Sequence, residues 1–246
     1  MRFIGIIPAR FSSSRFPGKP LASINGKTMI QRVYEQVIKT ESLTDVVIAT
    51  DDQRIENHIK DFGGKVVLTS TEHKSGTDRC FEAACIIKST ADIKEDDVII
   101  NIQGDEPYIN PIQIAQVINC FKNKEVRIAT LIKKINNEDE LFNPNVVKCI
   151  TSNKQKAIYF SRHPIPYIRN KPTNEWLNVH TFYKHIGIYA YYFSMLETIV
   201  KLEQTSLEIA ESLEQLRWIE NSLSIYTELT EYESFAVDTP KDINKF

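Results

Sequence analysis

The sequence lacks a long hydrophobic run. No stretch approaches the roughly 18 consecutive apolar residues that a membrane-spanning helix requires. The N-terminal segment MRFIGIIPAR is interrupted by Pro8 and Arg10, too soon for the apolar core of a signal peptide. We therefore expect a cytoplasmic protein with no membrane insertion.

Cysteine is scarce and shows no pairing pattern. The four cysteines include no CxxC pair and show no zinc-site spacing with the five histidines. They are Cys80, Cys85, Cys120 and Cys149. This excludes a zinc ribbon or a disulfide-stapled fold, and free thiols are typical of a reducing cytoplasm.

Excess charge and glycine-rich motifs are also missing. The formal net charge is -2, so no global basic field predicts a nucleic-acid partner. The eight glycines include no GxGxxG, which excludes the dinucleotide-binding fingerprint. An anionic ligand would therefore have to be held by a local cluster of Arg and Lys.

Short apolar runs alternate with amphipathic stretches in the first half of the chain. The alternation predicts a parallel sheet with helices on both faces, in which ligands bind at the carboxyl ends of the strands. The predicted strands are 3–7, 45–49, 65–68 and 97–102, and the predicted helices are 27–40, a segment from about residue 52, and 77–88.

The second half of the chain is less regular. It contains β-like runs within 145–160 and 185–192, a helical region over 193–221, and late strands at 224–229 and 235–237. An apolar stripe at helical spacing consists of Ile209, Leu213, Leu216 and Ile219. We interpret residues 1–246 as one domain with an inserted β-rich extension over roughly 140–190.

A loop rich in cations and hydroxyl groups follows the first predicted strand. PARFSSSRFPGKPL, residues 8–21, carries Arg10, Arg15 and Lys19 with three serines between them, a composition suited to binding anions. It is not a Walker A loop, because Ser13 replaces the first glycine and Pro20 follows the lysine. The alternative is a solvated basic loop, but its prolines and Gly18 favour a stiff, shaped one.

Two carboxylates also follow predicted strands. Asp105 lies in NIQGDEP, where Gly104 allows close backbone approach, and Asp238 lies in FAVDTPKDI. Each has a structural alternative: a turn at Asp105, and capping of a short helix at Asp238, where Thr239 and Asp242 form a weak capping box. Together with the basic loop, the two carboxylates match the layout of metal-assisted phosphoryl transfer.

Three weaker patterns remain. Arg79 ends TSTEHKSGTDR at a helix start, where anions bind and where the arginine could hydrogen-bond a base. Asp51 and Asp52 in ATDDQRI are expected to cap the next helix. A cluster suited to a carboxylate substrate comprises Arg162, His163, Lys184 and His185.

Read together, these segments resemble the Kdo cytidylyltransferase (CMP-Kdo synthetase) family; Kdo is 3-deoxy-manno-octulosonate. The matching segments occur in the expected order over nearly the whole chain: IPARFSSSRFPGKPL, VIATDDQRI, HKSGTDR, NIQGDEP, NPNVVK, YFSRHPIP, KHIGIYAYY, ESLEQLR and AVDTPKDI. The resemblance implies a Rossmann-like nucleotide-binding α/β fold, a homodimer built through the extension, and transfer of CMP from CTP to the anomeric hydroxyl of Kdo for lipopolysaccharide biosynthesis.

The resemblance also implies roles for individual residues. Arg10, Ser13, Arg15 and Lys19 would hold the CTP phosphates, with Arg15 and Lys19 acting in catalysis. Arg79 and Gln103 would contact the base or ribose, and Asp105 and Asp238 would ligate Mg²⁺. Arg162, His185, Glu214 and Gln215 would line the pocket for the acidic octulosonate sugar.

Three other functions are possible. A sialic acid cytidylyltransferase is disfavoured because the loop reads Pro-Gly-Lys-Pro. A glycosyltransferase would usually show Asp-x-Asp, whereas this chain has Gln103-Gly104-Asp105. A non-enzymatic nucleotide sensor or scaffold would have no reason to keep Lys19, Asp105 and Asp238 together. The sequence does not distinguish Kdo from its 8-amino analogue.

Overall fold

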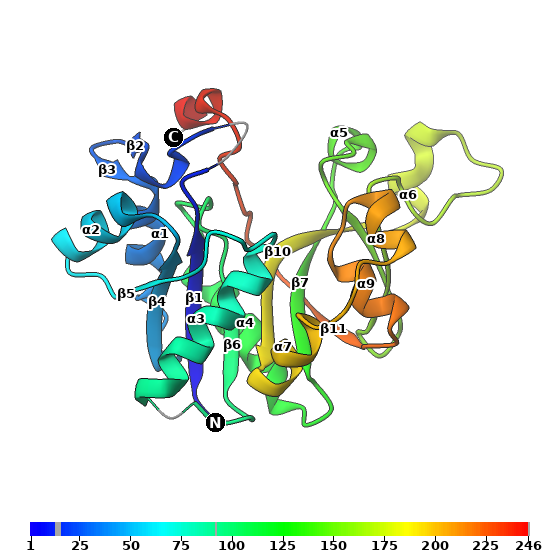
Figure 1. Cartoon of the computed structure of the whole chain (residues 1–246). Helices are drawn as coiled ribbons and strands as arrows, with labels where there is room; N and C mark the ends of the chain where they lie inside the picture. The colour runs from blue at the N-terminus through cyan, green and yellow to red at the C-terminus, as the bar shows by residue number, and fades with distance from the viewer. Residues whose placement is uncertain (13–15, 92, 246) are drawn as a thin grey trace.

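A twisted, mostly parallel sheet forms the centre of the molecule in the computed structural model, which describes residues 1–12, 16–91 and 93–245 (Figure 1). The strand order is β11-β7-β10-β6-β1-β4-β5, and β10 runs antiparallel to both of its neighbours β6 and β7. The strands are β1 Phe3–Ala9, β4 Asp45–Thr50, β5 Val66–Leu68, β6 Val98–Asn101, β7 Ile128–Lys134, β10 Tyr183–Tyr192 and β11 Ile225–Leu229, with β2 Ser23–Ile24 and β3 Lys27–Thr28 in a separate two-stranded sheet. The predicted α/β class is confirmed.

Helices cover both faces of this sheet. Side chains from α1, α2 and α4 pack into one apolar core, and side chains from α3, α7 and α9 pack into the other. Successive residues of β1 point to opposite faces, so Ile6 joins the second core and Ile7 the first. The helices are α1 Met29–Val37, α2 Gln53–Asp61, α3 Gly76–Ala91, α4 Pro111–Asn119, α5 Glu138–Phe142, α6 Trp176–Val179, α7 Phe193–Ile199, α8 Ser206–Glu211 and α9 Gln215–Glu220, with 3-10 turns at Lys19–Leu21, Cys120–Lys122, Thr173–Glu175 and Pro240–Lys245.

Helix starts follow local capping chemistry. The Asp52 side chain accepts a hydrogen bond from the Arg54 amide and caps α2, as predicted. Asn110 and Gln113 form a complete capping box at α4, with Pro111 in its first turn. The prediction that Asp51 also caps α2 was wrong. Its carboxylate pairs with Arg79 instead.

The segment around residues 140–190 is joined to the main sheet. The hairpin β8 Lys148–Thr151 and β9 Ala157–Ser161 pairs with the first residues of β10, while the last residues of β10 pair with β6. Figure 1 shows this part, with α5 and α6, on the opposite side of the molecule from α1 and α2. One continuous strand therefore connects the hairpin to the half of the sheet that contains β6, β1, β4 and β5.

Two expectations about the C-terminal third were wrong. Residues 235–237 form no strand; Val237 donates its amide to the Asp105 carbonyl, which belongs to a loop. The apolar stripe is interrupted because Ser212, with a positive φ of 51°, separates α8 from α9 and leaves Ile209 65% exposed. Among the described residues, no helix is long and apolar enough to cross a membrane.

Candidate active site

A cavity of about 260 Å³ opens at the carboxyl ends of β1 and β6. In parallel α/β sheets, this edge is where ligands bind. The cavity is lined by Pro8, Ala9, Arg10, Lys19, Pro20, His73, Lys74, Ser75, Gly76, Arg79, Gln103, Gly104, Asp105 and Asp238. The structure thus brings together the predicted residues Arg10, Lys19, Arg79, Gln103, Asp105 and Asp238.

Lys19 links the three segments that meet at one wall of this cavity. Its Nζ lies 2.6 Å from Oδ2 of Asp105 and donates to the Val237 carbonyl at 2.8 Å. The Val237 amide in turn donates to the Asp105 carbonyl at 2.9 Å. The cation of the basic loop and the carboxylate after β6 are therefore in direct contact, in a partly buried setting.

Gly104 has the close backbone approach that its sequence position suggested. A Cβ atom at this position would lie 2.7 Å from the Pro8 carbonyl oxygen, so a larger residue would push the loop after β6 away from the end of β1. The neighbouring Gln103 donates from its amide to the Gly187 carbonyl, where the pairing of β10 with β7 is irregular. This bond fixes the Gln103 side chain at the cavity wall.

The C-terminal turn is capped by residues next to Asp238. The Asp242 carboxylate accepts hydrogen bonds from the Thr239 amide and hydroxyl, and from the Asp238 amide. The expected interaction between Thr239 and Asp242 is therefore present. Asp238 itself lines the cavity with Asp105. Metal binding by the Asp238 carboxylate stays a prediction.

The two carboxylates fit the way proteins bind Mg²⁺. Among the described residues, no cluster of three or more His, Cys, Asp or Glu forms a complete metal cage. Mg²⁺ is usually held by one or two carboxylates together with phosphate and water oxygens, so a pair suffices. Asp105 would have to exchange its contact with Lys19 for a contact with the metal.

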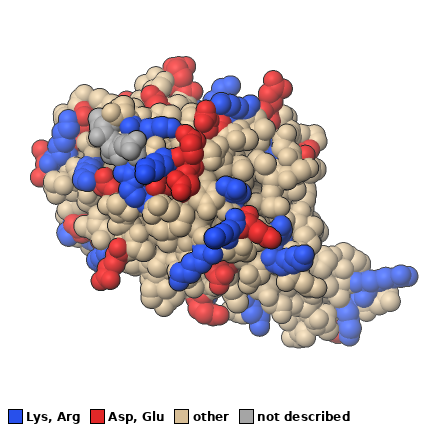
Figure 2. Space-filling model, turned by 90° about the horizontal axis from the view of Figure 1, so that it is seen from below, with Lys and Arg blue, Asp and Glu red and all other residues tan. Residues whose placement is uncertain are grey.

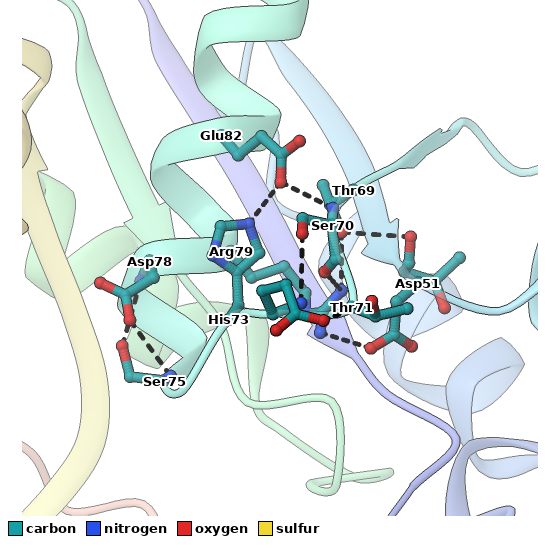
Figure 3. Close-up of polar contacts among 11 residues, drawn as sticks. Asp51, Thr69, Ser70, Thr71, His73, Ser75, Asp78, Arg79 and Glu82 are labelled. Atoms are coloured by element: carbon teal, nitrogen blue, oxygen red, sulfur yellow. Dashed lines mark hydrogen bonds and ion pairs between the residues drawn. The ribbon is translucent and has the colours of Figure 1, made fainter.

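Another part of the cavity wall is the loop between β5 and α3, shown in Figure 3. The Arg79 guanidinium bonds to Asp51 and to the Thr69 hydroxyl, both at 2.6 Å, and its side chain is only 4% exposed. These contacts hold the loop in place from inside the fold. A direct contact between Arg79 and the nucleotide stays a prediction.

The predicted phosphate-binding loop is described only in part. Arg10 lines the cavity and is exposed, while Ser13 and Arg15 lie outside the described residues. The loop is closed by a hydrogen bond from the Gly18 amide to the Phe11 carbonyl. The φ of Gly18 is 71°, a left-handed conformation that favours glycine.

The residues expected to bind the acidic sugar do not line this cavity. His185 lies in β10, where its Nε2 is 2.9 Å from the Thr130 hydroxyl, and burial lowers its pKa to about 3. Since the Thr130 hydroxyl donates to the Ile188 carbonyl at 2.7 Å, it accepts from His185. His185 is therefore a neutral imidazole that donates through Nε2.

The other members of this set are held by neighbouring backbone and side chains. The Arg162 guanidinium donates to the carbonyls of Pro144, Glu211 and Ser212. Burial raises the pKa of Glu214, although the Thr77 hydroxyl donates to its carboxyl group at 2.9 Å. Gln215 is buried.

The contact between Glu214 and Thr77 has a further consequence for the site. Thr77 lies in the first turn of α3, next to Gly76 in the cavity wall, so the start of α9 adjoins the cavity.

Lys184 is paired with Glu140 and Glu233 at 2.6 and 2.8 Å, so its charge is already compensated. This argues against Lys184 as a carboxylate ligand.

Sequence reasoning did not single out two buried aromatic residues beside His185. The Tyr189 ring packs against both His185 and Trp218, with centroids 5.1 and 4.9 Å apart. Within the part of the chain that the structure describes, the Tyr189 hydroxyl and the Trp218 Nε1 have no hydrogen-bond partner. Buried polar atoms without a hydrogen-bond partner are rare in proteins, which makes this pair a feature that packing alone does not explain. In the sequence, the only sign of such a role is that Tyr and Trp each combine a large apolar ring with one polar group.

The Rossmann-like sheet and the pair formed by Lys19 and Asp105 at its carboxyl edge are typical of nucleotidyltransferases. The cytidylyltransferase family model matches residues 4–226, and this chain belongs to that family. The 3-deoxy-manno-octulosonate cytidylyltransferase of Parabacteroides distasonis is 55% identical, over 100% of this chain and 96% of its own length.

Two further comparisons bear on substrate and fold. The 8-amino-3,8-dideoxy-manno-octulosonate cytidylyltransferase of Shewanella piezotolerans is 46% identical, over 97% of this chain and 94% of its own. The solved structure of CMP:2-keto-3-deoxy-manno-octonic acid synthetase complexed with CTP aligns with a TM-score of 0.89 and 38% identity, covering 100% of this chain and 96% of that one.

Proposed function

We propose that this cytidylyltransferase transfers CMP from CTP to the anomeric hydroxyl of Kdo and releases pyrophosphate. The observation that carries the proposal is the meeting of Lys19, Asp105 and Asp238 at one cavity, where a cation and two carboxylates face the same space. The full-length similarity to Kdo cytidylyltransferases supports the choice of substrates.

The triphosphate would lie along the basic loop. CTP carries concentrated negative charge, which Arg10, Arg15 and Lys19 would neutralise, and Lys19 would stabilise the departing pyrophosphate. A preorganised cation of this kind acts on charge that develops in the transition state. The nucleoside would then face the wall formed by residues 73–79 and Gln103.

Asp105 and Asp238 are the residues that would hold Mg²⁺. The ion would supply charge stabilisation at the α-phosphate and favour ionisation of the attacking hydroxyl group. The contribution of the chain is to hold both carboxylates at one wall, with Lys19 beside Asp105. In-line positioning and charge stabilisation require no covalent enzyme intermediate.

The acidic sugar would bind next to the cavity, among Arg162, His185, Glu214 and Gln215. Support for this location comes from the contact of Glu214 with Thr77, one residue from the cavity wall, and from the unpartnered polar atoms of Tyr189 and Trp218. The neutral His185 would help fix the ring orientation without adding charge.

The biological setting follows from the same proposal. The product would feed lipopolysaccharide assembly, and the enzyme would act in the cytoplasm. It would form a homodimer through the extension, whose exposed apolar side chains include Ile158, Tyr167 and Val179. The face seen in Figure 2, which is turned away from the carboxyl ends of the strands, carries acidic and basic side chains interspersed rather than one continuous basic surface for a nucleic acid.

The test is pyrophosphate release with each of the four nucleoside triphosphates and three acidic sugars: Kdo, 8-amino-Kdo and sialic acid. We expect turnover with CTP and Kdo. Preference for 8-amino-Kdo would assign the chain to the activity of its Shewanella relative. Absence of pyrophosphate release with every combination would overturn the proposed enzyme function.

A further inference from the structure

His73 is a cavity-lining residue that the reaction described above leaves without a role. It lies in the loop between β5 and α3, and its Nε2 is hydrogen-bonded to the Glu82 carboxylate. Figure 3 shows Glu82 extending from α3 toward both His73 and Ser70. The Ser70 amide donates to the same carboxylate oxygen at 2.8 Å.

Glu82 determines which nitrogen of His73 carries the proton. Burial would raise the pKa of Glu82, but hydrogen bonds from the Ser70 amide and His73 lower it below its ordinary value. An ionised carboxylate can only accept hydrogen bonds, so Nε2 of His73 must be the donor. In the neutral imidazole, Nδ1 then carries a lone pair and accepts.

The acceptor on His73 remains available. Across the described residues, Glu82 is the only hydrogen-bond partner of His73. The loop carrying it is fixed from the protein interior, because the Arg79 guanidinium also bonds to the Thr69 hydroxyl and the Ser70 carbonyl. His73 thus presents a preorganised acceptor at the wall that the proposed function leaves for the nucleoside.

We infer that His73, positioned by Glu82, selects cytosine by accepting a hydrogen bond from its 4-amino group through Nδ1. This inference rests on the proposed function and names the group that reads the base. Uracil has a carbonyl oxygen where cytosine has the amino group, so UTP would bring two acceptors face to face. A site built to bind an N–H group rejects an analogue lacking it, because its own polar atom stays unpaired.

The experiment compares kcat/KM for CTP and UTP, with Kdo and Mg²⁺, in the wild type, His73→Ala and Glu82→Gln. Loss of one hydrogen bond to His73 should lower the value for CTP about tenfold, while the value for UTP should stay the same or rise because the acceptor facing the uracil carbonyl is removed. The amide introduced by Glu82→Gln can also donate to Nε2, which permits the other tautomer. This variant should therefore gain activity with UTP.

Glu72→Gln provides the matched control, since Glu72 is an exposed carboxylate on the same loop that accepts from the Thr71 hydroxyl. It should keep the wild-type ratio of CTP to UTP. Equal losses with CTP and UTP in His73→Ala, or an unchanged ratio in both test variants, would overturn the inference. Thermal melts of each variant identify any that fail to fold, and in that case the other test variant decides.

Binding of CMP and UMP to the wild type and the same variants, measured by calorimetry, separates this inference from the proposed function. A wild type that prefers CMP and loses this preference in His73→Ala and Glu82→Gln supports base reading, even if turnover with Kdo is absent. Equal affinity of the wild type for CMP and UMP contradicts it, even if the enzyme turns over CTP.

Discussion

Replacing Lys19 by methionine tests the contact at the centre of the cavity. Lys19→Met keeps most of the length of the side chain and removes its charge, so both the 2.6 Å contact with Asp105 and the bond to the Val237 carbonyl are lost. If the cation stabilises charge that develops during transfer, turnover should fall about 10²–10³-fold.

The cost in stability should be modest by comparison. The lysine and aspartate side chains are 17% and 25% exposed, so the pair is partly screened by water. Hydrogen bonds to charged groups contribute about 1.5–3 kcal/mol, and we expect a loss of about 2 kcal/mol. For a chain of this size, that loss corresponds to a fall in Tm of about 4–8 °C.

The assay combines initial rates of pyrophosphate release, a magnesium titration and a thermal melt. Because Lys19 and a metal ion compete for Asp105, the variant should need less magnesium for half-maximal rate while its maximal rate is low. Lys27→Met is the control: Lys27 forms a similar 2.7 Å pair with Glu35 on the surface, away from the cavity. Wild-type turnover in Lys19→Met would refute the catalytic role, and a loss of the folded state would indicate a structural one.

Three other predictions concern the carboxylates. Asp238→Asn should fold normally, since the Asp242 carboxylate caps the turn and Asn keeps the size of the side chain, yet it should lose most activity and require more magnesium; an unchanged magnesium titration would refute metal binding by Asp238. Exhaustive chelation should abolish turnover, and added Mg²⁺ should restore it; full activity after chelation would refute a metal role. Burial raises the pKa of Glu106 from 4.5 to about 7, so the folded state retains a proton that the unfolded chain releases. The contribution of Glu106 to stability should therefore be fully present below pH 4.5 and fall by about 3 kcal/mol as the pH rises through 7. Glu106→Gln should flatten this dependence in urea melts at several pH values; equal slopes would contradict the assignment.

Local sequence chemistry predicted the parts of the fold that depend on near neighbours. Asp52 caps α2 because its hydrogen-bond partner is the amide two residues later, and the apolar strand before Asn101 is bounded by polar residues. Residues 235–237 have a strand-like composition, but a strand needs a neighbouring strand edge. The Val237 amide meets the loop at Asp105 instead, which no local pattern could reveal.

The site was predictable to the extent that its residues follow strands. Lys19 and Asp105 follow β1 and β6, and the rule that ligands bind at carboxyl ends predicted that they would meet. Asp238 lines the same cavity, although the strand predicted before it is absent. The environment of a side chain was harder to infer. Asp51 has the sequence position of a cap and instead neutralises Arg79, while His185 is buried against a hydroxyl group 55 positions away.

The continuity of β10 limits how this chain could be rearranged, by evolution or by an engineer. Tyr183, the first residue of this ten-residue strand, pairs with β8, and Tyr192, the last residue, pairs with β6. A cut made to exchange the proposed sugar-binding part for that of another enzyme would have to pass through β10, which is one strand from Tyr183 to Tyr192 although its pairing with β7 is irregular between Ile186 and Tyr189. Sugar preference in this architecture is therefore more readily changed by point substitution than by transplanting a module.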